Sequence, residues 1–370
     1  MKGSFLFGAW VVAQVLAECS RGAAWTELGP KPISTGPYSG RVSAVAADPV
    51  DPNRFFAAGA SGGVWRTLDG GVTWTPLTDQ LPTAAIGALA MDPNNSDVLY
   101  AGSGEANYAN HSLYGLGLYK STDGGDTWQV LGVDTFGGRT FSRIVVSHSD
   151  SQGVYAAIGN AGGFPAKTAA KNHPRRDDPV GVYRSLDGGN TWTQLTNGLP
   201  SVAATDLIMD PANANILYAA IGHIFGHAQN GVYKSIDTGD SWSLLGGGLP
   251  SGMGRHSLAI APADSMRLYA LITLPCDSVG GGGATLDLYR SDNAGLTWSP
   301  TGPGSMQATY GWYLSAVVVH PTDPETLLIG GLTVLRSTDG GGFYQNVTPP
   351  HVDIHALEYA ADGTLICGND

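Results

Sequence analysis

The chain has 370 residues, of which 42% are hydrophobic and only 14% are charged, and its formal net charge is −12. A chain with this balance is not intrinsically disordered, and it is long enough to bury a sizeable core. The negative charge argues against a nucleic-acid partner, because phosphate backbones repel an acidic surface. The 53 Gly, 9 Trp and 15 Tyr favour many short strands joined by tight turns.

The N-terminal segment differs from the rest of the chain. Lys2 precedes an apolar stretch, residues 4–17, that is too short to span a bilayer comfortably and ends in the small residue Ala17. This pattern predicts a signal peptide over residues 1–17, and therefore a secreted or periplasmic protein. A buried N-terminal strand is the alternative. Glu18 stands before Cys19 where a lipoprotein signal has a small residue, which argues against a lipid anchor.

The cysteines do not form a disulfide framework. The chain has only three, Cys19, Cys276 and Cys367. Cys276 and Cys367 could pair in an oxidising compartment, but they lie about two sequence repeats apart. Separate thiols are therefore the expectation.

One sequence pattern, S/T-x-D-x-G-x-T/S-W, recurs roughly every fifty residues along the chain. Each copy follows a G-x-Y/W-R/K-S/T segment, and two apolar runs separated by an Asp-Pro type of turn come earlier in each unit. Asp can hydrogen-bond within its own turn and Gly can take a positive φ, so the pattern predicts a tight turn between two strands. Each unit therefore contains four short strands, A to D, with the repeated turn between C and D.

Four antiparallel strands in each repeat are typical of the blades of a β-propeller. Residues 354–368 supply the first two strands of a seventh unit, and residues 24–28 read as an outer strand D that could close the ring. No segment provides the third strand, so we expect the chain to be truncated at its C-terminus. The prediction is a single all-β domain over residues 24–370, a seven-bladed β-propeller with a partial seventh blade. The six full four-stranded blades are expected at residues 41–77, 84–131, 141–195, 202–245, 255–300 and 313–348.

The repeated turn resembles the Asp-box, or BNR repeat. That motif occurs in sialidases, xyloglucan-hydrolysing glucanases, sortilin-type receptors and a photosystem II assembly factor. The resemblance covers nearly all of residues 25–370 and implies that the Asp-boxes lie in the C–D turns and serve folding. A structural role is therefore expected for Asp69, Asp123, Asp187, Asp237, Asp339, Trp74, Trp128, Trp192, Trp242 and Trp298.

The long insertions favour one face of the propeller as the functional one. In a blade of this topology the A–B and C–D turns share one face, and the B–C and D–A loops share the other. The insertions fall in the B–C loops, at residues 103–117, 160–180, 222–230 and 273–285. Binding residues are commonly carried on long loops held by a rigid scaffold. We therefore expect ligands to bind at the loop-rich mouth of the central channel.

The segment His351-Val-Asp353-Ile-His355 contains the densest set of potential ligands. Alternate residues of an extended strand point to one face, so these three side chains could project together toward the mouth. Imidazole and carboxylate suit zinc or another transition-metal ion. A hydrogen-bonded polar lining and a catalytic role are the alternatives. We expect that no cofactor is required, and a bound metal ion is the one cofactor that the sequence leaves open.

Two further groups could contribute at the mouth. Glu105 could act as an acid/base carboxylate opposite Asp353, or it could simply cap neighbouring amides. Tyr310, Trp312 and Tyr313 could stack on sugars or peptides, or pack between blades. The expected ligand-binding set is His351, Asp353, His355, Tyr310, Trp312, Tyr313, Glu105 and Asn107.

The sequence leaves the activity uncertain. A sialidase-like site needs an arginine triad and a Tyr/Glu pair that cannot be assigned here. The xyloglucanase-like family carries an Asp just before a Gly-Gly in its first blade, where this chain has Ala60. We therefore predict a secreted, sortilin-like binding module for an extracellular protein, peptide or glycan, with no nucleic-acid partner and no membrane span after signal removal. The alternative is a xyloglucanase-like or sialidase-like glycoside hydrolase acting on extracellular polysaccharide.

Overall fold

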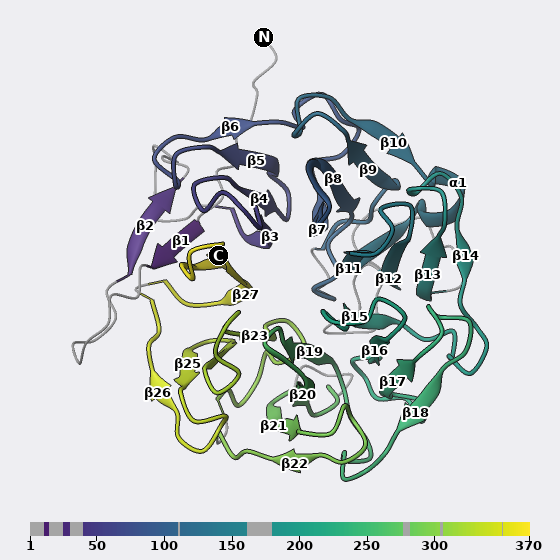
Figure 1. Cartoon of the computed structure of the whole chain (residues 1–370), viewed down its shortest axis with the longest axis vertical. Helices are drawn as coiled ribbons and strands as arrows, with labels where there is room; N and C mark the ends of the chain where they lie inside the picture. The colour runs from purple at the N-terminus through teal and green to yellow at the C-terminus, as the bar shows by residue number, and fades with distance from the viewer. Residues whose placement is uncertain are drawn as a thin grey trace.

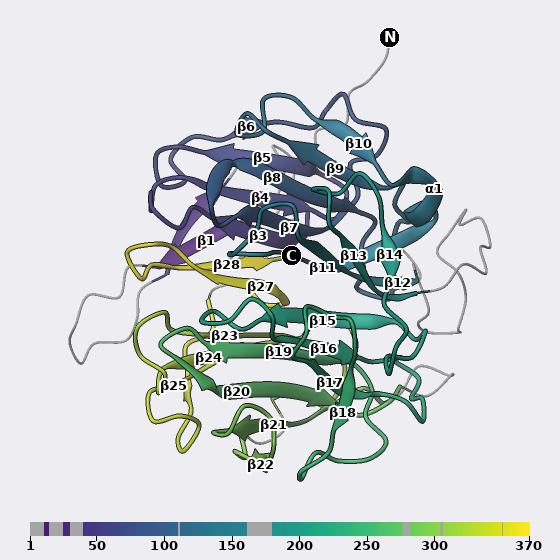
Figure 2. The same cartoon turned by 45° about the vertical axis from the view of Figure 1, so that its right-hand side comes forward.

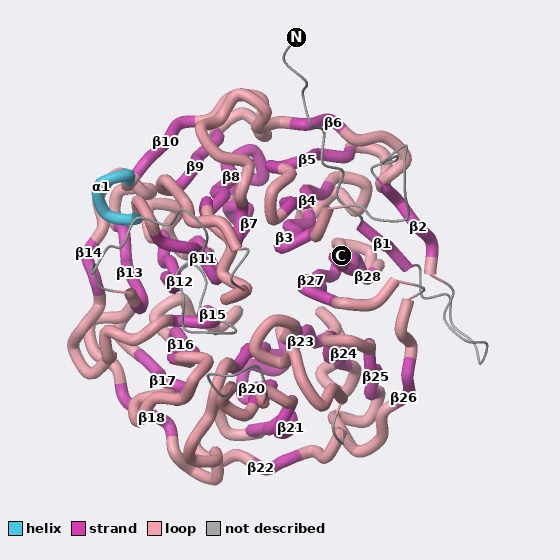
Figure 3. The backbone as a smooth tube through the Cα atoms, turned by 180° about the vertical axis from the view of Figure 1, so that it is seen from behind, coloured by secondary structure: helices cyan, strands magenta, loops and turns pink. Residues whose placement is uncertain are grey.

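The computed structural model describes residues 11–14, 25–29, 40–109, 112–160, 180–276, 282–303, 306–349 and 351–370. Four-stranded antiparallel sheets surround a central axis in a ring (Figure 1). The inner strands are β3, β7, β11, β15, β19, β23 and β27, and strands such as β6, β10 and β14 lie at the periphery (Figure 3). The prediction of an all-β propeller is confirmed.

Six of the sheets are blades that each come from one continuous stretch of chain, at the expected places. In each of these blades the chain runs from the inner strand outward, because short turns join antiparallel neighbours. The first three blades are β3 (Val42–Ala47), β4 (Phe55–Gly59), β5 (Gly63–Thr67), β6 (Thr75–Pro76); β7 (Ile86–Asp92), β8 (Asn95–Ser103), β9 (Leu118–Ser121), β10 (Gln129–Leu131); and β11 (Arg139–Val146), β12 (Val154–Asn160), β13 (Gly181–Ser185), β14 (Thr193–Gln194). The next three are β15 (Ala204–Met209), β16 (Leu217–Ile221), β17 (Gly231–Ser235), β18 (Ser243–Leu245); β19 (His256–Ala261), β20 (Asp264–Thr273), β21 (Thr285–Ser291), β22 (Ser299–Pro300); and β23 (Ala316–Val319), β24 (Leu327–Gly330), β25 (Val334–Ser337), β26 (Gln345–Asn346).

The prediction of seven blades is corrected to six, and the place of the seventh is taken by a sheet made from both ends of the chain. This closing sheet has the order β2-β1-β28-β27, with β27 at Ile354–Tyr359, β28 at Leu365–Asn369, β1 at Val11–Gln14 and β2 at Thr26–Gly29. Its strands β27 and β28 lie between the first and the sixth blade (Figure 2).

Two strands of the closing sheet come from the N-terminal region. The strand expected near residues 24–28 is the outermost strand, β2, and the indole nitrogen of Trp25 donates to the carbonyl of Val347 at 2.5 Å. The position expected to be empty holds β1, whose Val12 pairs with Cys367. Because β1 falls within the predicted signal peptide, cleavage there would remove this strand from the sheet.

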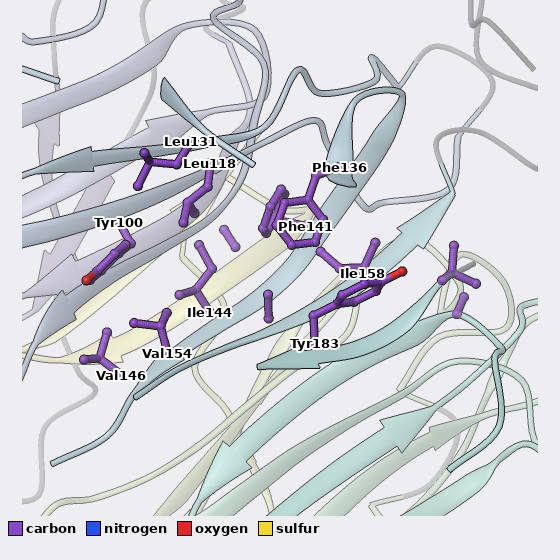
Figure 4. Close-up of a cluster of buried hydrophobic side chains, with 14 residues drawn as sticks. Tyr100, Leu118, Leu131, Phe136, Phe141, Ile144, Val146, Val154, Ile158 and Tyr183 are labelled. Atoms are coloured by element: carbon purple, nitrogen blue, oxygen red, sulfur yellow. The ribbon is translucent and has the colours of Figure 1, made fainter. Parts of the chain in front are cut away.

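The hydrophobic core is divided into layers between neighbouring sheets. One layer joins the second and third blades, where Tyr100 and Leu118 face Phe141 and Ile158 (Figure 4). The short helix α1 (Val133–Phe136) adds Phe136, whose ring lies 4.9 Å from that of Phe141 in an edge-on contact. Because each sheet buries both faces against its neighbours, the ring as a whole buries what one blade could not bury alone.

Hydrogen bonds within each repeated turn stabilise it, and they involve the Ser or Thr, Asp, Gly and Trp positions that recur in the pattern. In the third blade, Ser185 Oγ donates to Asp187 Oδ1 at 2.7 Å and accepts from the Gly189 N–H at 2.8 Å. Thr191 donates to Asp187 through both its hydroxyl, at 2.6 Å, and its backbone N–H, at 2.9 Å. The Trp192 indole donates to the Gly189 carbonyl at 2.9 Å. The hydrogen bonds that Asp187 accepts, of which that from the Thr191 hydroxyl has the largest effect, lower the pKa of Asp187 to about 2.

The Lys or Arg that precedes each repeated turn has a role that sequence reasoning left unassigned. Arg66 donates to the Gly124 carbonyl, in the repeated turn of the next blade, at 2.8 Å. The same bond recurs from Lys120 to Gly188, Arg184 to Thr238, Lys234 to Ala294 and Arg290 to Gly340, at 2.8, 2.9, 2.9 and 2.9 Å. Each of the first five blades therefore binds the repeated turn of the following blade.

Cys276 and Cys367 are both buried and are not joined to each other, so the disulfide considered from the sequence is not formed. Burial raises the pKa of the Cys367 thiol. Within the described part of the chain, no helix combines the length and apolar character needed to cross a bilayer.

Candidate functional site

The inner strands share a small residue at one position near the mouth. In β3, β11 and β15 the pairing register skips one residue, and Ser43, Ser142 and Thr205 occupy these bulges. Their hydroxyls donate to a carbonyl of the next inner strand: Ser43 to Ile86 at 2.5 Å, Ser142 to Ala204 at 2.6 Å and Thr205 to His256 at 2.7 Å. The position thus normally joins one blade to the next.

His355 breaks this pattern. It occupies the corresponding bulge in β27, between Ile354 and Ala356, and its side chain is only 1% exposed. Its Nδ1 lies 3.1 Å from the Asn107 amide nitrogen, its Nε2 lies 3.0 Å from Asp370 Oδ1, and its ring meets Tyr313 edge-on at 4.8 Å. A large polar ring in place of a small residue turns this bulge into the centre of a side-chain cluster.

The hydrogen bonds fix the tautomer of His355. The Asn107 amide nitrogen also lies 3.0 Å from Glu105 Oε1, and a carboxylate oxygen accepts, so this atom is a donor. Nδ1 of His355 therefore accepts from Asn107, and Nε2–H donates to Asp370. Burial lowers the pKa of His355 and outweighs the opposing effect of Asp370, which favours a neutral ring.

Glu105 is held in a buried ion pair. Its side chain is 1% exposed, and its Oε1 lies 2.5 Å from the Arg41 guanidinium. Arg41 also donates to the Tyr313 hydroxyl and lies 5.3 Å from the centre of that ring. Burial disfavours the charge of Arg41, but the charges of Glu105, Tyr313 and Asp370 and the hydrogen bond to Glu105 together outweigh it, so the pKa of Arg41 is raised. Glu105 is thus suited to anchoring Arg41 rather than to the acid/base role opposite Asp353.

Two carboxylates at the mouth have unequal environments. Asp353 is half-buried, and burial, followed by the nearby charge of Asp370, raises its pKa. Asp370 is 35% exposed and accepts the hydrogen bond from His355. Asp353, whose raised pKa favours the protonated form, thus lies near Asp370, which accepts a hydrogen bond from the neutral His355 ring. Such unequal pairs can divide the roles of acid and base.

The proposed metal-ligand geometry of His351, Asp353 and His355 is not formed. Strand β27 begins only at Ile354, and Asp353 takes a positive φ of 64°, so the three residues do not alternate along one strand. His351 is exposed, whereas both ring nitrogens of His355 are engaged. Over the described ranges, no three His, Cys, Asp or Glu side chains are grouped in a way that could hold a metal ion.

The three aromatic candidates, Tyr310, Trp312 and Tyr313, differ in how exposed they are. Tyr310 is 46% exposed, whereas Trp312 is 4% exposed and packs with Tyr108 and Cys276. Tyr313 is half-buried within the cluster, and burial raises the pKa of its hydroxyl. Tyr310 is thus the aromatic ring open to a ligand, and Trp312 is a core residue.

The structure brings several predicted residues into one mouth cluster, defined as Arg41, Glu105, Asn107, Tyr313, Asp353, His355 and Asp370. Sequence reasoning missed Arg41 and Asp370. An alignment of the inner strands against one another would have singled out His355, since the aligned positions in the first five blades are Ser43, Gly87, Ser142, Thr205 and Ser257.

Below the mouth cluster, the inner strands enclose a cavity of about 240 Å³. Its lining includes Asn107, Arg143, Asp206, Arg255, His355 and Glu358. Burial raises the pKa of Glu358 against the opposing charge of Arg143. On the rim, Ala60 is buried and its N–H donates to the Arg41 carbonyl at 2.9 Å, so the first blade presents no carboxylate at this position.

No family model matches the chain. In sequence it is 30% identical over 177 residues to the xyloglucanase Xgh74A of Acetivibrio thermocellus, a match that covers 41% of this chain and 19% of that protein. It is 26% identical over 212 residues to the oligoxyloglucan-reducing end-specific xyloglucanase of Emericella nidulans, covering 53% of this chain and 23% of the relative. The chain thus spans about a fifth of the length of these curated relatives.

Solved structures give the same fold. The chain superposes on the GH74 xyloglucanase of Xanthomonas campestris with a TM-score of 0.63 and 20% sequence identity, covering 89% of this chain and 51% of that one. These comparisons favour the glycoside hydrolase alternative over the binding module that was our main prediction. The protein- or peptide-binding hypothesis gains no support from them, nor does a likeness to sortilin-type receptors.

Proposed function

We propose that this propeller is part of a glycoside hydrolase that acts on xyloglucan or a related β-glucan outside the cytoplasm. The observation that carries the proposal is the pair of unequal carboxylates, Asp353 and Asp370, at the mouth of a propeller similar in sequence to xyloglucanases. The glycan would lie across the mouth, with Tyr310 offering an exposed aromatic face to a sugar ring.

The two carboxylates would divide the chemistry of glycosidic bond cleavage. Asp353, whose raised pKa favours the protonated form, would donate a proton to the leaving oxygen. Asp370 would act as the ionised partner, held in place by His355. Asn107 and Tyr313 fix the orientation of the His355 ring and thereby that of Asp370.

Release of reducing ends from xyloglucan and other β-glucans tests the proposal. The wild-type chain should release reducing ends, and the Asp353→Asn/Asp370→Asn double variant should reduce the rate by about a hundredfold or more, since acid–base groups commonly contribute 10²–10⁴-fold. Asp362→Asn is a matched control, because Asp362 is an exposed carboxylate in the β27–β28 turn that accepts a hydrogen bond from Thr364. Equal rates in the double variant and the control would refute the assigned roles.

A second candidate function, glycan binding without hydrolysis, is favoured by two observations. Ala60 stands where the resembled xyloglucanase-like family carries a carboxylate, and Glu105 is engaged by Arg41. Xyloglucan retained by the folded wild-type chain with no release of reducing ends would support this alternative and exclude hydrolysis by this chain alone.

A further inference from the structure

Arg255 is a partly buried cation that forms no ion pair with a carboxylate among the described residues. It lies at the start of β19, where its Nη1 donates to the Trp312 and Tyr313 carbonyls at 3.2 and 2.9 Å. Its guanidinium carbon lies 5.8 Å from the centre of the Tyr108 ring. No carboxylate of the described residues lies within ion-pair distance of it. By contrast, ion pairs are formed by Arg41, Arg54, Arg66, Arg143, Arg184, Arg267 and Arg290.

The hydrogen-bonding capacity of Arg255 is only partly used. A guanidinium has five N–H donors, and here only Nη1 reaches acceptors among the described residues. The Nε atom is buried without a partner. Burying a cation that is not paired with an anion is costly, and this desolvation lowers the pKa of Arg255. The site therefore has both charge and hydrogen-bond donors left for a ligand.

Among the carboxylates that raise the pKa of Arg255, Asp206 has the larger effect, but it is already engaged by other partners. Asp206 also lines the central cavity, but its Oδ1 accepts from the Leu207 N–H at 2.8 Å and its Oδ2 from the Leu258 N–H at 2.9 Å. Asp206 further lies 3.7 Å from the Nε of Arg143. These bonds hold the carboxylate to β15, β19 and Arg143, so that, over the ranges that the structure describes, no carboxylate reaches Arg255 at contact distance.

Arg255 borders the cavity of about 240 Å³ below the mouth cluster, together with Asn107, Ser142 and Ser257. The hydroxyls of Ser142 and Ser257 donate to backbone carbonyls, at 2.6 and 2.9 Å, so their oxygens remain acceptors for a ligand's hydroxyl groups. The cavity thus combines one uncompensated guanidinium with polar groups suited to a hydroxylated molecule.

We propose that this cavity is an anion site in which Arg255 binds the carboxylate of a hydroxylated small acid, either free or carried as a uronic acid on a glycan. A guanidinium matches the geometry of a carboxylate better than that of a point anion. A single negative charge fits because the Asp206 carboxylate also lines the cavity and would repel a dianion such as phosphate more strongly. This site goes beyond the proposed function, since it takes an acidic group that the hydrolysis of a neutral glucan does not require.

Titration of the full chain with D-glucuronate, D-glucose and sodium chloride at matched ionic strength tests the site, read by calorimetry and by the melting temperature. Glucuronate should bind and raise the melting temperature, whereas glucose and chloride should not. Arg255→Lys keeps the charge but loses the planar fork, so it should weaken glucuronate binding by about tenfold or more. Arg143→Gln is the matched control, because Arg143 lines the same cavity but is paired with Asp206.

The outcomes separate the possible sources of the carboxylate and the two proposals. A glucuronate-bearing oligosaccharide that binds more tightly than free glucuronate identifies the glycan as the source, and the reverse order identifies a free acid. Equal responses to glucuronate and glucose in the wild-type chain would overturn the proposal even if the Arg255 variant failed to fold. Equal losses in Arg255→Lys and Arg143→Gln would overturn the assignment to Arg255. Anion binding with no release of reducing ends would leave this site standing while the hydrolase proposal fails.

Discussion

The face that carries the repeated turns and the mouth of the channel differ in how their polar residues are hydrogen-bonded. On the face of the repeated turns, Asp69, Asp123 and Asp187 are exposed or nearly so and are satisfied by hydrogen bonds within their own turns. At the mouth, Glu105, Asn107 and His355 are buried single-copy residues that depend on partners from distant blades. Repetition thus marks what holds the ring together, and departure from the repeat marks the candidate site.

The largest difference between the two faces is expected in the free energy of unfolding that is lost when one partner of an ion pair is removed. Glu105→Gln removes the buried carboxylate that pairs with the Arg41 guanidinium, so we expect the free energy of unfolding to fall by about 3 kcal/mol. Asp126→Asn removes the 63% exposed partner of Arg66 on the opposite face and should cost less than about 1 kcal/mol. Chemical denaturation of both variants measures this difference, and equal losses would contradict the contrast between the two faces.

A smaller effect is expected on the dependence of stability on pH. His355 is buried and its pKa is lowered from 6.5, so the unfolded chain binds a proton that the folded chain resists. Stability should therefore fall as pH drops below about 6.5, and His355→Asn should reduce that slope. His256, whose pKa burial also lowers, should account for part of the remaining slope. The exposed His351 gives the control, and a slope changed equally by His351→Asn would contradict the assignment.

The smallest effect is expected for a single repeated turn. The pKa of Asp187 is about 2 against an ordinary 3.8, so its ionised form stabilises the fold at pH values above the ordinary pKa. That contribution is lost as pH falls from about 4 toward about 2. Asp187→Asn should flatten this acid-side loss in a series of thermal melts, with the exposed Asp362→Asn as control. A variant whose acid dependence matches the wild-type chain would show that the turn does not depend on ionisation.

The repeat predicted the six contiguous blades and their turns because the signal is local. The repeated turn between the third and fourth strands of a blade is short, and its own residues dictate its conformation, as the Ser185–Thr191 hydrogen bonds show. The blade-to-blade bonds of Arg66 and its counterparts also follow from the repeat, once one blade is known to face the turn of the next.

The mouth cluster could be predicted only in part. Glu105, Asn107, Tyr313, Asp353 and His355 were chosen from the loop-rich face, and they do gather there. The premise that His351 and Asp353 belong to an extended strand was wrong, because β27 begins at Ile354, after both residues. Arg41 and Asp370 gave no local sequence signal, because their importance comes from buried contacts with Glu105 and His355.

The sequence by itself thus determined the class of fold, the places of six blades and the face on which the unusual residues lie, since all three follow from the periodicity of short segments. Tertiary structure decided how the ring closes, through β1 and β2 beside β28, and which charges are paired. It buried Glu105 against Arg41 and left Arg255 without an ion-pair partner among the described residues. Such pairings are set by contacts between residues far apart in the chain, and the energy of a charge depends on its burial and its partners rather than on its sequence neighbours.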